Sequence, residues 1–163
     1  MRYLQRFWEF LPSTLLRLDW VPSAVAADER TSRYIFDKEH FNEAQGRVKY
    51  TAFMPAKKTT DISVYRTKDC REWRIWAIGR YFVERRRPDN VVLRARGDLP
   101  AMAYVQQSLR VTADRKPHPR HAIVAYWPNE ESEQRVKAIG LAHDALLLLN
   151  PRAPKRRPSG TPE

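Results

Sequence analysis

The stretch SLRVTADRKPHPRHAIVAYW, residues 108–127, is the most informative part of the chain for the fold. Apolar and polar residues alternate in SLRVTAD and again in HAIVAYW, a pattern typical of half-buried strands. The intervening RKPHPR contains two prolines, which cannot donate a ladder hydrogen bond and therefore favour a turn. The stretch predicts an antiparallel hairpin.

His118 lies in the turn of this hairpin and His121 opens its second strand, with Pro119 and Arg120 between them. A zinc site here would need a third ligand, such as His40 or His143, and the prolines exclude a helix that would align the pair. No carboxylate lies next to the two histidines, and the chain has no paired His-x-Ser/Thr motif. We therefore expect no catalytic residue and no metal site, and we retain His118 and His121 as a candidate ligand loop that is stiff, exposed and cationic.

Residues 128–149 predict one long C-terminal helix. Three glutamates lie near its first turn, where the helix dipole favours negative charge. The helical spacing of apolar residues predicts a face that packs on a sheet, comprising Val136, Ile139, Ala142 and Leu146.

Weaker patterns predict the remaining elements. They are a short helix over 37–45, strands over 47–55 and 60–67 that form a hairpin, a helix over 71–83, a strand over 90–96 and a helix over 97–107 capped by Asp98. Together these elements predict an α+β fold, with a small, mostly antiparallel sheet covered by helices.

Three regions follow from composition. Residues 1–30 predict an amphipathic helical segment, with Leu4, Phe7, Trp8 and Leu11 on one face. Residues 31–150 predict the α+β core domain. Residues 151–163 carry four prolines and four basic residues, which predicts a disordered basic tail. The N-terminal segment either packs on the core or docks a larger protein partner through residues 1–20.

The charge is strongly basic and clustered. The chain has 163 residues, with 30 Lys or Arg and 19 Asp or Glu, for a net charge of +11. Residues 71–96 contribute +5, while residues 107–120 and the tail contribute +3 each, so these three regions hold the whole excess. A basic excess of this size favours polyanionic partners, and arginine binds phosphate through two parallel hydrogen bonds.

We therefore expect nucleic acid as the partner, without distinguishing DNA from RNA. The rings of Tyr81, Phe82 and Tyr104 lie in or between the basic regions and could stack on bases. The predicted nucleic-acid-binding residues are Arg71, Arg74, Arg80, Arg85, Arg86, Arg87, Arg94, Arg96, Arg110, Arg115, Lys116, Arg120, Lys155, Arg156 and Arg157.

The remaining expectations are broader. The single cysteine, Cys70, excludes an intramolecular disulfide and favours the cytoplasm. No run approaches the roughly 20 apolar residues that cross a bilayer, so we expect no membrane partner. No cofactor motif is present. We expect a non-catalytic accessory subunit of a larger prokaryotic assembly, in a mobile-element or defence system. The alternatives are a small phosphoester- or nucleotide-processing enzyme, using His118, His121 and nearby arginines, and a protein-docking subunit.

Overall fold

A six-stranded antiparallel sheet forms the centre of the computed structural model, which describes residues 18–57 and 59–153. The strand order is β6-β7-β4-β1-β5-β8. The strands are β1 (Arg30–Ile35), β4 (Ile62–Arg66), β5 (Ala95–Pro100), β6 (Arg110–Ala113), β7 (His121–Ala125) and β8 (Leu146–Leu149). A separate pair joins β2 (Phe41–Asn42) and β3 (Arg47–Val48). The predicted α+β fold with a mostly antiparallel sheet is confirmed.

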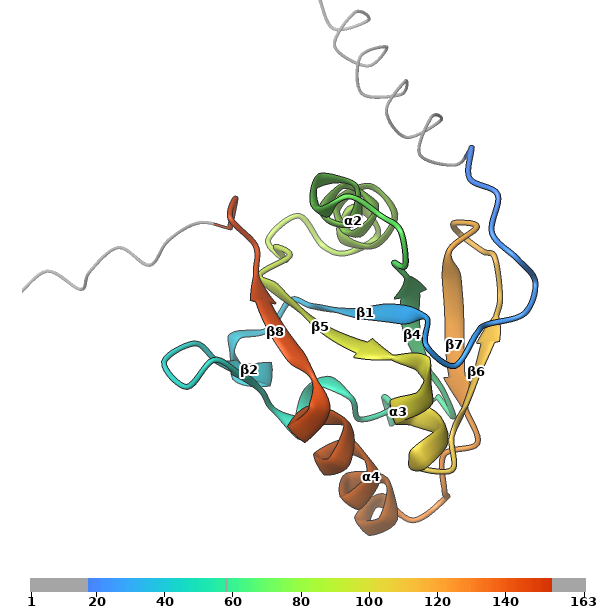
Figure 1. Cartoon of the computed structure of the whole chain (residues 1–163). Coiled ribbons are helices and arrows are strands. Elements are labelled where there is room, and N and C mark those ends of the chain that lie inside the picture. Colours follow the sequence, from blue (N-terminus) through green and yellow to red (C-terminus); the bar gives the residue numbers. More distant parts are fainter. Residues whose placement is uncertain (1–17, 58, 154–163) are drawn as a thin grey trace, which may run out of the picture.

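Helices cover both faces of the sheet (Figure 1). On one face lies α2 (Glu72–Ile78), which continues through the π-helical turn Gly79–Val83 and the 3-10 turn Glu84–Arg86; we call residues 72–86 the α2 segment. On the other lie α3 (Ala101–Gln106), α4 (Glu131–Asp144) and the 3-10 turn Tyr50–Ala52. One further 3-10 turn, Lys38–His40, precedes β2. Among the described residues, no helix has the length and apolar character needed to cross a membrane.

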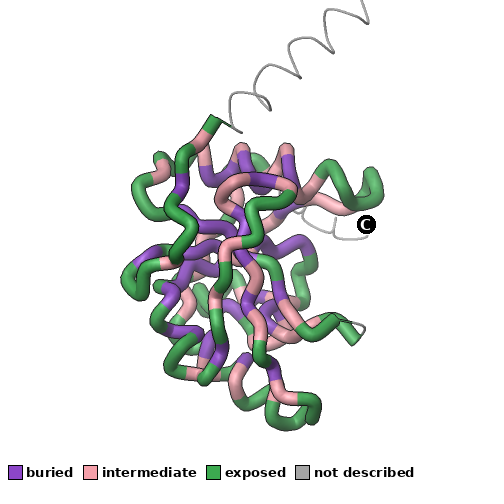
Figure 2. Tube along the Cα trace, turned by 90° about the vertical axis from the view of Figure 1, so that its right-hand side faces the viewer, coloured by how far each residue is buried: buried purple, intermediate pink, exposed green. Residues whose placement is uncertain are grey.

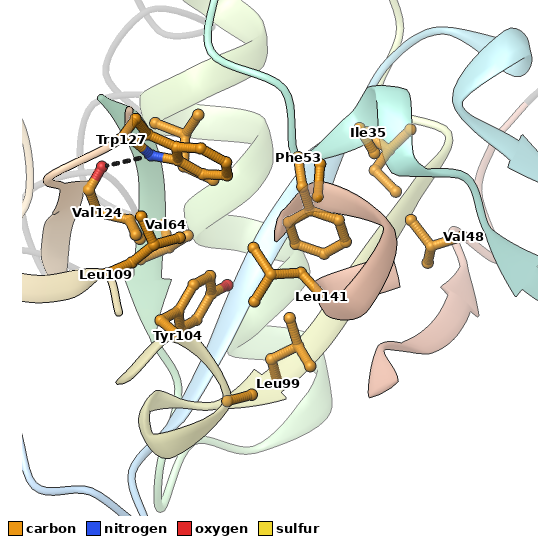
Figure 3. Packing of buried hydrophobic residues seen from close by; sticks show 14 of the residues in the cluster. Ile35, Val48, Phe53, Val64, Leu99, Tyr104, Leu109, Val124, Trp127 and Leu141 are labelled. Carbon is orange, nitrogen blue, oxygen red and sulfur yellow. Dashed lines mark hydrogen bonds between the residues drawn. The ribbon is translucent and has the colours of Figure 1, made fainter. Parts of the chain in front are cut away.

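The face under α3 and α4 is apolar (Figure 3). Phe53, Tyr104 and Leu141 are completely buried there. The indole Nε1 of Trp127 donates a hydrogen bond of 3.1 Å to the carbonyl oxygen of Val124, which satisfies the one polar atom of that ring. This layer is the larger of the two hydrophobic clusters.

The opposite face packs closely against the α2 segment. The phenol of Tyr34 donates a hydrogen bond of 2.6 Å to the carbonyl oxygen of Ile75 in α2. A Cβ at Gly79 would lie 2.7 Å from atoms of both Leu93 and Tyr34, so only glycine permits this approach of helix to sheet. The buried stretches run through the middle of the molecule, where these layers meet (Figure 2).

Two predicted features match the structure closely. The hairpin over 108–127 is confirmed as β6 and β7, with Val111 opposite Val124. The predicted helix over 71–83 is confirmed, and its helical turns continue to residue 86.

Several expectations between residues 30 and 67 are wrong. The central strand β1 was not predicted. The region 37–45 forms a single 3-10 turn followed by β2. Phe41 is buried in the larger hydrophobic cluster as the first residue of β2, so it does not continue a helix. The region 47–55 keeps only the two residues of β3 before the next turn. The strand over 60–67 exists as β4, but its partners are β1 and β7.

The predicted C-terminal helix ends early. It stops at Asp144, and the following leucines form β8 against β5. Its predicted apolar face is also wrong, because Val136 and Ile139 are 67% and 48% exposed while Ala138 and Leu141 are buried. A run of identical leucines has no periodicity, so only the hydrogen-bond partner on β5 distinguishes strand from helix.

The region around Asp98 also differs from expectation. The strand predicted over 90–96 lies at 95–100, so Asp98 belongs to β5 and caps no helix. Its carboxylate accepts a hydrogen bond of 2.6 Å from the hydroxyl of Ser32 on β1. The predicted N-terminal helix with Leu4, Phe7, Trp8 and Leu11, and the predicted disordered tail beyond residue 153, lie outside the described residues.

Candidate nucleic-acid interface

A cleft opens on the α2 face of the sheet, between the end of the α2 segment and strands β1, β4 and β7. It holds a volume of about 430 Å³. We call it the arginine cleft. Its lining residues are Arg33, Tyr34, Phe36, Ser63, Tyr65, Phe82, Val83, Arg86, Arg87, Pro117 and His121.

The cleft is cationic. Three arginines line it, and its described lining includes no aspartate or glutamate. Arg33 is held in place, because its Nε donates to the carbonyl oxygen of Ala52 and its Nη1 to that of Ser63, at 3.0 and 2.8 Å. The guanidinium of Arg87 lies 4.1 Å from the ring centre of Phe36. Arg86 and Arg87 are exposed, so the cleft presents charge to an incoming anion.

A row of three rings crosses neighbouring strands at the cleft. Tyr34 on β1, Tyr65 on β4 and His121 on β7 share one face of the sheet, and the ring centres of Tyr65 lie 5.2 Å from those of Tyr34 and of His121. Side chains at matching positions of adjacent strands meet in this way. Burial raises the pKa of Tyr65 to about 12, so its phenol is neutral at pH 7.

His121 has a carboxylate partner. Its Nδ1 lies 2.8 Å from Oδ2 of Asp114, which follows β6, and the backbone N–H of Asp114 donates to the carbonyl oxygen of His121 at 3.1 Å. The premise that neither histidine has a neighbouring carboxylate is therefore wrong: the hairpin brings together residues seven apart in the chain. An Asp at Nδ1 fixes the ring so that Nε2 carries the lone pair.

The protonation state of His121 follows from two opposing effects. Burial lowers the pKa of His121, and this outweighs the hydrogen bond that its ring donates to Asp114, which raises it. Since an unperturbed histidine titrates near pH 6.5, His121 is neutral at pH 7 and available as a proton acceptor.

His118 occupies a different environment from His121. Its side chain is completely buried, against the expectation of an exposed loop, and its ring centre lies 4.6 Å from that of Phe82 in the α2 segment. Its Nδ1 accepts a hydrogen bond of 3.1 Å from the backbone N–H of Arg120. These contacts give His118 a packing role beneath the α2 segment.

A second cavity of about 610 Å³ adjoins the cleft. The two share Arg33, Tyr34, Phe36 and Arg87. The second adds basic side chains from Lys38 and Arg94, but also acids, Asp37 and Glu39. Of these two cavities, the arginine cleft is therefore the one whose described lining carries basic and no acidic side chains.

The structure brings together only some of the predicted arginines. Arg86 and Arg87 line the cleft and Arg94 lines the second cavity. Arg85 lies over the ring of Tyr81, at 4.4 Å. Arg33 completes the cleft and was missed, because a single arginine in TSRYIF carries no signal before β1 is recognised as its strand.

Other predicted arginines are engaged within the fold. Arg96 is completely buried, with Nη2 2.8 Å from Glu72 and Nε 3.0 Å from Asp98. Arg74 and Arg120 both form ion pairs with Asp19. Arg115 donates to the carbonyl oxygen of Val21.

Four further predicted residues are described and do not line the cleft. Arg71 is exposed before α2, Arg80 is half-buried in the π-helical turn, Arg110 is exposed on the edge strand β6, and Lys116 is exposed in the β6–β7 loop. Lys155, Arg156 and Arg157 lie outside the described residues.

In the described part of the chain, no three His, Cys, Asp or Glu side chains converge in a way that could hold a metal ion. No family model, no curated protein and no solved structure matches this chain.

Proposed function

We propose that the protein binds nucleic acid through the arginine cleft. The observation that carries the proposal is the combination of three arginines, no acidic lining residue and several aromatic rings within one cavity of about 430 Å³. Ligand sites of this kind have volumes of about 300–1,000 Å³, which suits a nucleotide-sized unit of a strand.

Each group of residues suits one part of a nucleotide. Guanidinium groups bind phosphate through paired hydrogen bonds and stack on planar groups. Arg86 and Arg87, at the exposed rim, would contact the phosphate backbone of the strand. The rings of Phe36 and Tyr34 would contact an unpaired base. The arrangement favours a single strand, because a duplex keeps its bases stacked and unavailable to a cavity.

The wider role stays a proposal based on size and charge. We propose an accessory subunit that delivers nucleic-acid affinity to a larger prokaryotic assembly. Docking through residues 1–20 would be compatible with this role, because the cleft is formed by other residues.

Salt dependence tests the binding. A fluorescein-labelled single-stranded oligonucleotide should lose affinity steeply between 50 and 200 mM salt, because bound arginines release counterions. Replacing Arg86 and Arg87 together with alanine should weaken binding and reduce the slope of log K against log salt by about 1.4, two single-strand contacts' worth.

The matched control is Arg47→Ala, which removes an exposed arginine on β3 outside the cleft. It should leave the slope and the affinity nearly unchanged. Affinity that does not vary with salt, or an equal loss in the control and the double variant, would contradict the proposal.

A further inference from the structure

We propose that the arginine cleft cleaves RNA, with His121 as the general base that deprotonates a ribose 2′-hydroxyl and Asp114 as the residue that positions its ring. The proposal rests on the proposed function, since a strand must first bind in the cleft. We expected no catalytic role for the loop histidines, because no carboxylate is adjacent to them in the sequence. Asp114 supplies that carboxylate in the structure, so the proposal reverses this expectation for His121.

The imidazole of His121 is held at one nitrogen and unpaired at the other among the described residues. Nδ1 of His121 lies 2.8 Å from the Asp114 carboxylate, and Nε2 has no hydrogen-bond partner among the described residues. The side chain is 8% exposed and lines the cleft. A histidine that lines a cavity, with one nitrogen held by a carboxylate and the other unpaired among the described residues, has the features of a general base.

His121 differs in its surroundings from His143 and His40. His143 on α4 forms a similar pair, with Nδ1 2.9 Å from Asp144, but it is 85% exposed and lies outside both described cavities. His40 lines the second cavity, and no described carboxylate is hydrogen-bonded to its ring. Of the described histidines, His121 combines a carboxylate partner with a cationic cavity.

The arginines of the cleft suit the charge that develops in this reaction. When the 2′-oxygen attacks the neighbouring phosphorus, negative charge builds up on the phosphate oxygens. Arg33, Arg86 and Arg87 line the same cleft and would stabilise that charge. Because the nucleophile belongs to the substrate, its proximity to phosphorus is inherent in RNA.

The step balances without a further reactant. A bond forms between the 2′-oxygen and phosphorus, and the bond from phosphorus to the 5′-oxygen of the next nucleotide breaks. Nε2 of His121 takes the 2′-hydroxyl proton, and the leaving 5′-oxygen takes a proton from water; the imidazolium then returns its proton to the hydroxide. The products are a 2′,3′-cyclic phosphate and a 5′-hydroxyl. DNA has no 2′-hydroxyl and should bind without being cut.

The substrate test uses an oligonucleotide of DNA with one central ribonucleotide, beside its all-DNA counterpart. The full-length protein should cut only the first, on the 3′ side of the ribonucleotide, and mass spectrometry should find a cyclic phosphate end. Cutting of the all-DNA strand, or a linear phosphate as the first product, would overturn the inference.

The variant test separates catalysis from binding. His121→Gln should lower kcat by about 10²–10⁴-fold while the Kd for the uncut DNA strand stays within about twofold. His143→Gln is the matched control, and it should cut like the natural protein. Equal activity in His121→Gln would show a different catalyst or a contaminating nuclease.

If His121→Gln fails to fold, Asp114→Asn still tests the proposal. His121 is faced by Asp114 and Asp61, which raise its pKa, by Arg86, which lowers it, and by the neutral phenol of Tyr65. Removing the Asp114 charge should lower kcat and move the acid limb of the kcat/KM profile to lower pH. An unmoved limb would overturn the positioning role.

Binding data distinguish the two proposals. Salt-sensitive binding of both strands without any cutting would overturn RNA cleavage and leave nucleic-acid binding intact. Failure to bind either strand would overturn both.

Discussion

The two faces of the sheet bury very different side chains. Under α3 and α4 the interior is mostly apolar, with residues such as Phe53 and Leu141 completely buried, and the buried hydroxyl of Thr31 is hydrogen-bonded there. Under α2 the buried positions include Ser32, Arg96 and Asp98 beside the aromatic rings. The difference indicates that one face supplies most of the hydrophobic stabilisation, while the other holds polar groups in fixed positions beside the arginine cleft.

The buried polar groups on the α2 face bond to one another, but two of their atoms have no hydrogen-bond partner among the described residues. Asp98 accepts from Ser32 and pairs with Arg96, which also reaches Glu72 and lies 4.5 Å from the ring centre of Trp76. Arg96 Nη1 and Asp98 Oδ2 are buried and have no hydrogen-bond partner among the described residues. Buried polar atoms without a hydrogen-bond partner lower the free energy of unfolding, so the polar arrangement on this face reduces the stability of the fold.

The largest expected effect tests the apolar face. Leu141→Ala should reduce the free energy of unfolding by about 2–5 kcal/mol, because it leaves a cavity in the completely buried layer. Urea denaturation followed by tryptophan fluorescence measures this loss. Val136→Ala on the same helix is the control and should change stability by less than about 0.5 kcal/mol, because Val136 is exposed. Equal losses in Leu141→Ala and Val136→Ala would instead support the apolar face that helical spacing predicted.

An intermediate effect tests the polar face. Asp98→Ala should cost about 3 kcal/mol, because it leaves the buried Arg96 guanidinium with one partner fewer. Asp144→Ala removes an exposed carboxylate and should cost far less. The same denaturation experiment compares them. A negligible loss for Asp98→Ala would mean that water replaces the carboxylate, and the two faces would then differ less than their burial suggests.

The smallest expected effect is the response of His121 to pH. Burial lowers its folded-state pKa below the unfolded value of about 6.5, so the unfolded chain binds the proton more readily. The contribution of His121 to the free energy of unfolding therefore decreases as pH falls from about 6.5 through the lowered pKa. Above pH 6.5 this contribution does not change. Proton NMR titration of the imidazole gives the pKa directly, and a value above 6.5 would contradict the burial argument.

The same pH experiment needs a comparison, because carboxylates and other histidines titrate nearby. His40 also has a pKa lowered by burial. The difference in pH-dependent stability between the natural protein and His121→Gln isolates the contribution of His121. If the two curves stay parallel below pH 6.5, the cleft histidine is not the source of the dependence.

Local signals were enough for several features. Alternation around a proline-rich turn predicted β6 and β7. Spacing alone fitted a helix and a strand about equally over 71–83, and the apolar run IWAIG followed by a basic run favoured the helix that the structure contains. The basic run ending that segment contributed Arg86 and Arg87 to the predicted site, and the start of the second hairpin strand contributed His121.

The rest of the candidate site was hidden because its members are distant in sequence. Arg33, Tyr65 and His121 come from three strands, and they meet only through the order β7-β4-β1. The partnership of Asp114 with His121 depends on the length of the hairpin loop, which the alternation of the strands does not specify.

By itself, the sequence determined the α+β class, the β6–β7 hairpin, the α2 segment and the basic charge, because periodicity, proline and composition act over a few neighbouring residues. The tertiary structure decided which strand the four leucines would join, which face of α4 would be buried, and which arginines would line a cavity instead of pairing with acids. These outcomes depend on partners far along the chain, whose hydrogen bonds and packing override local preference.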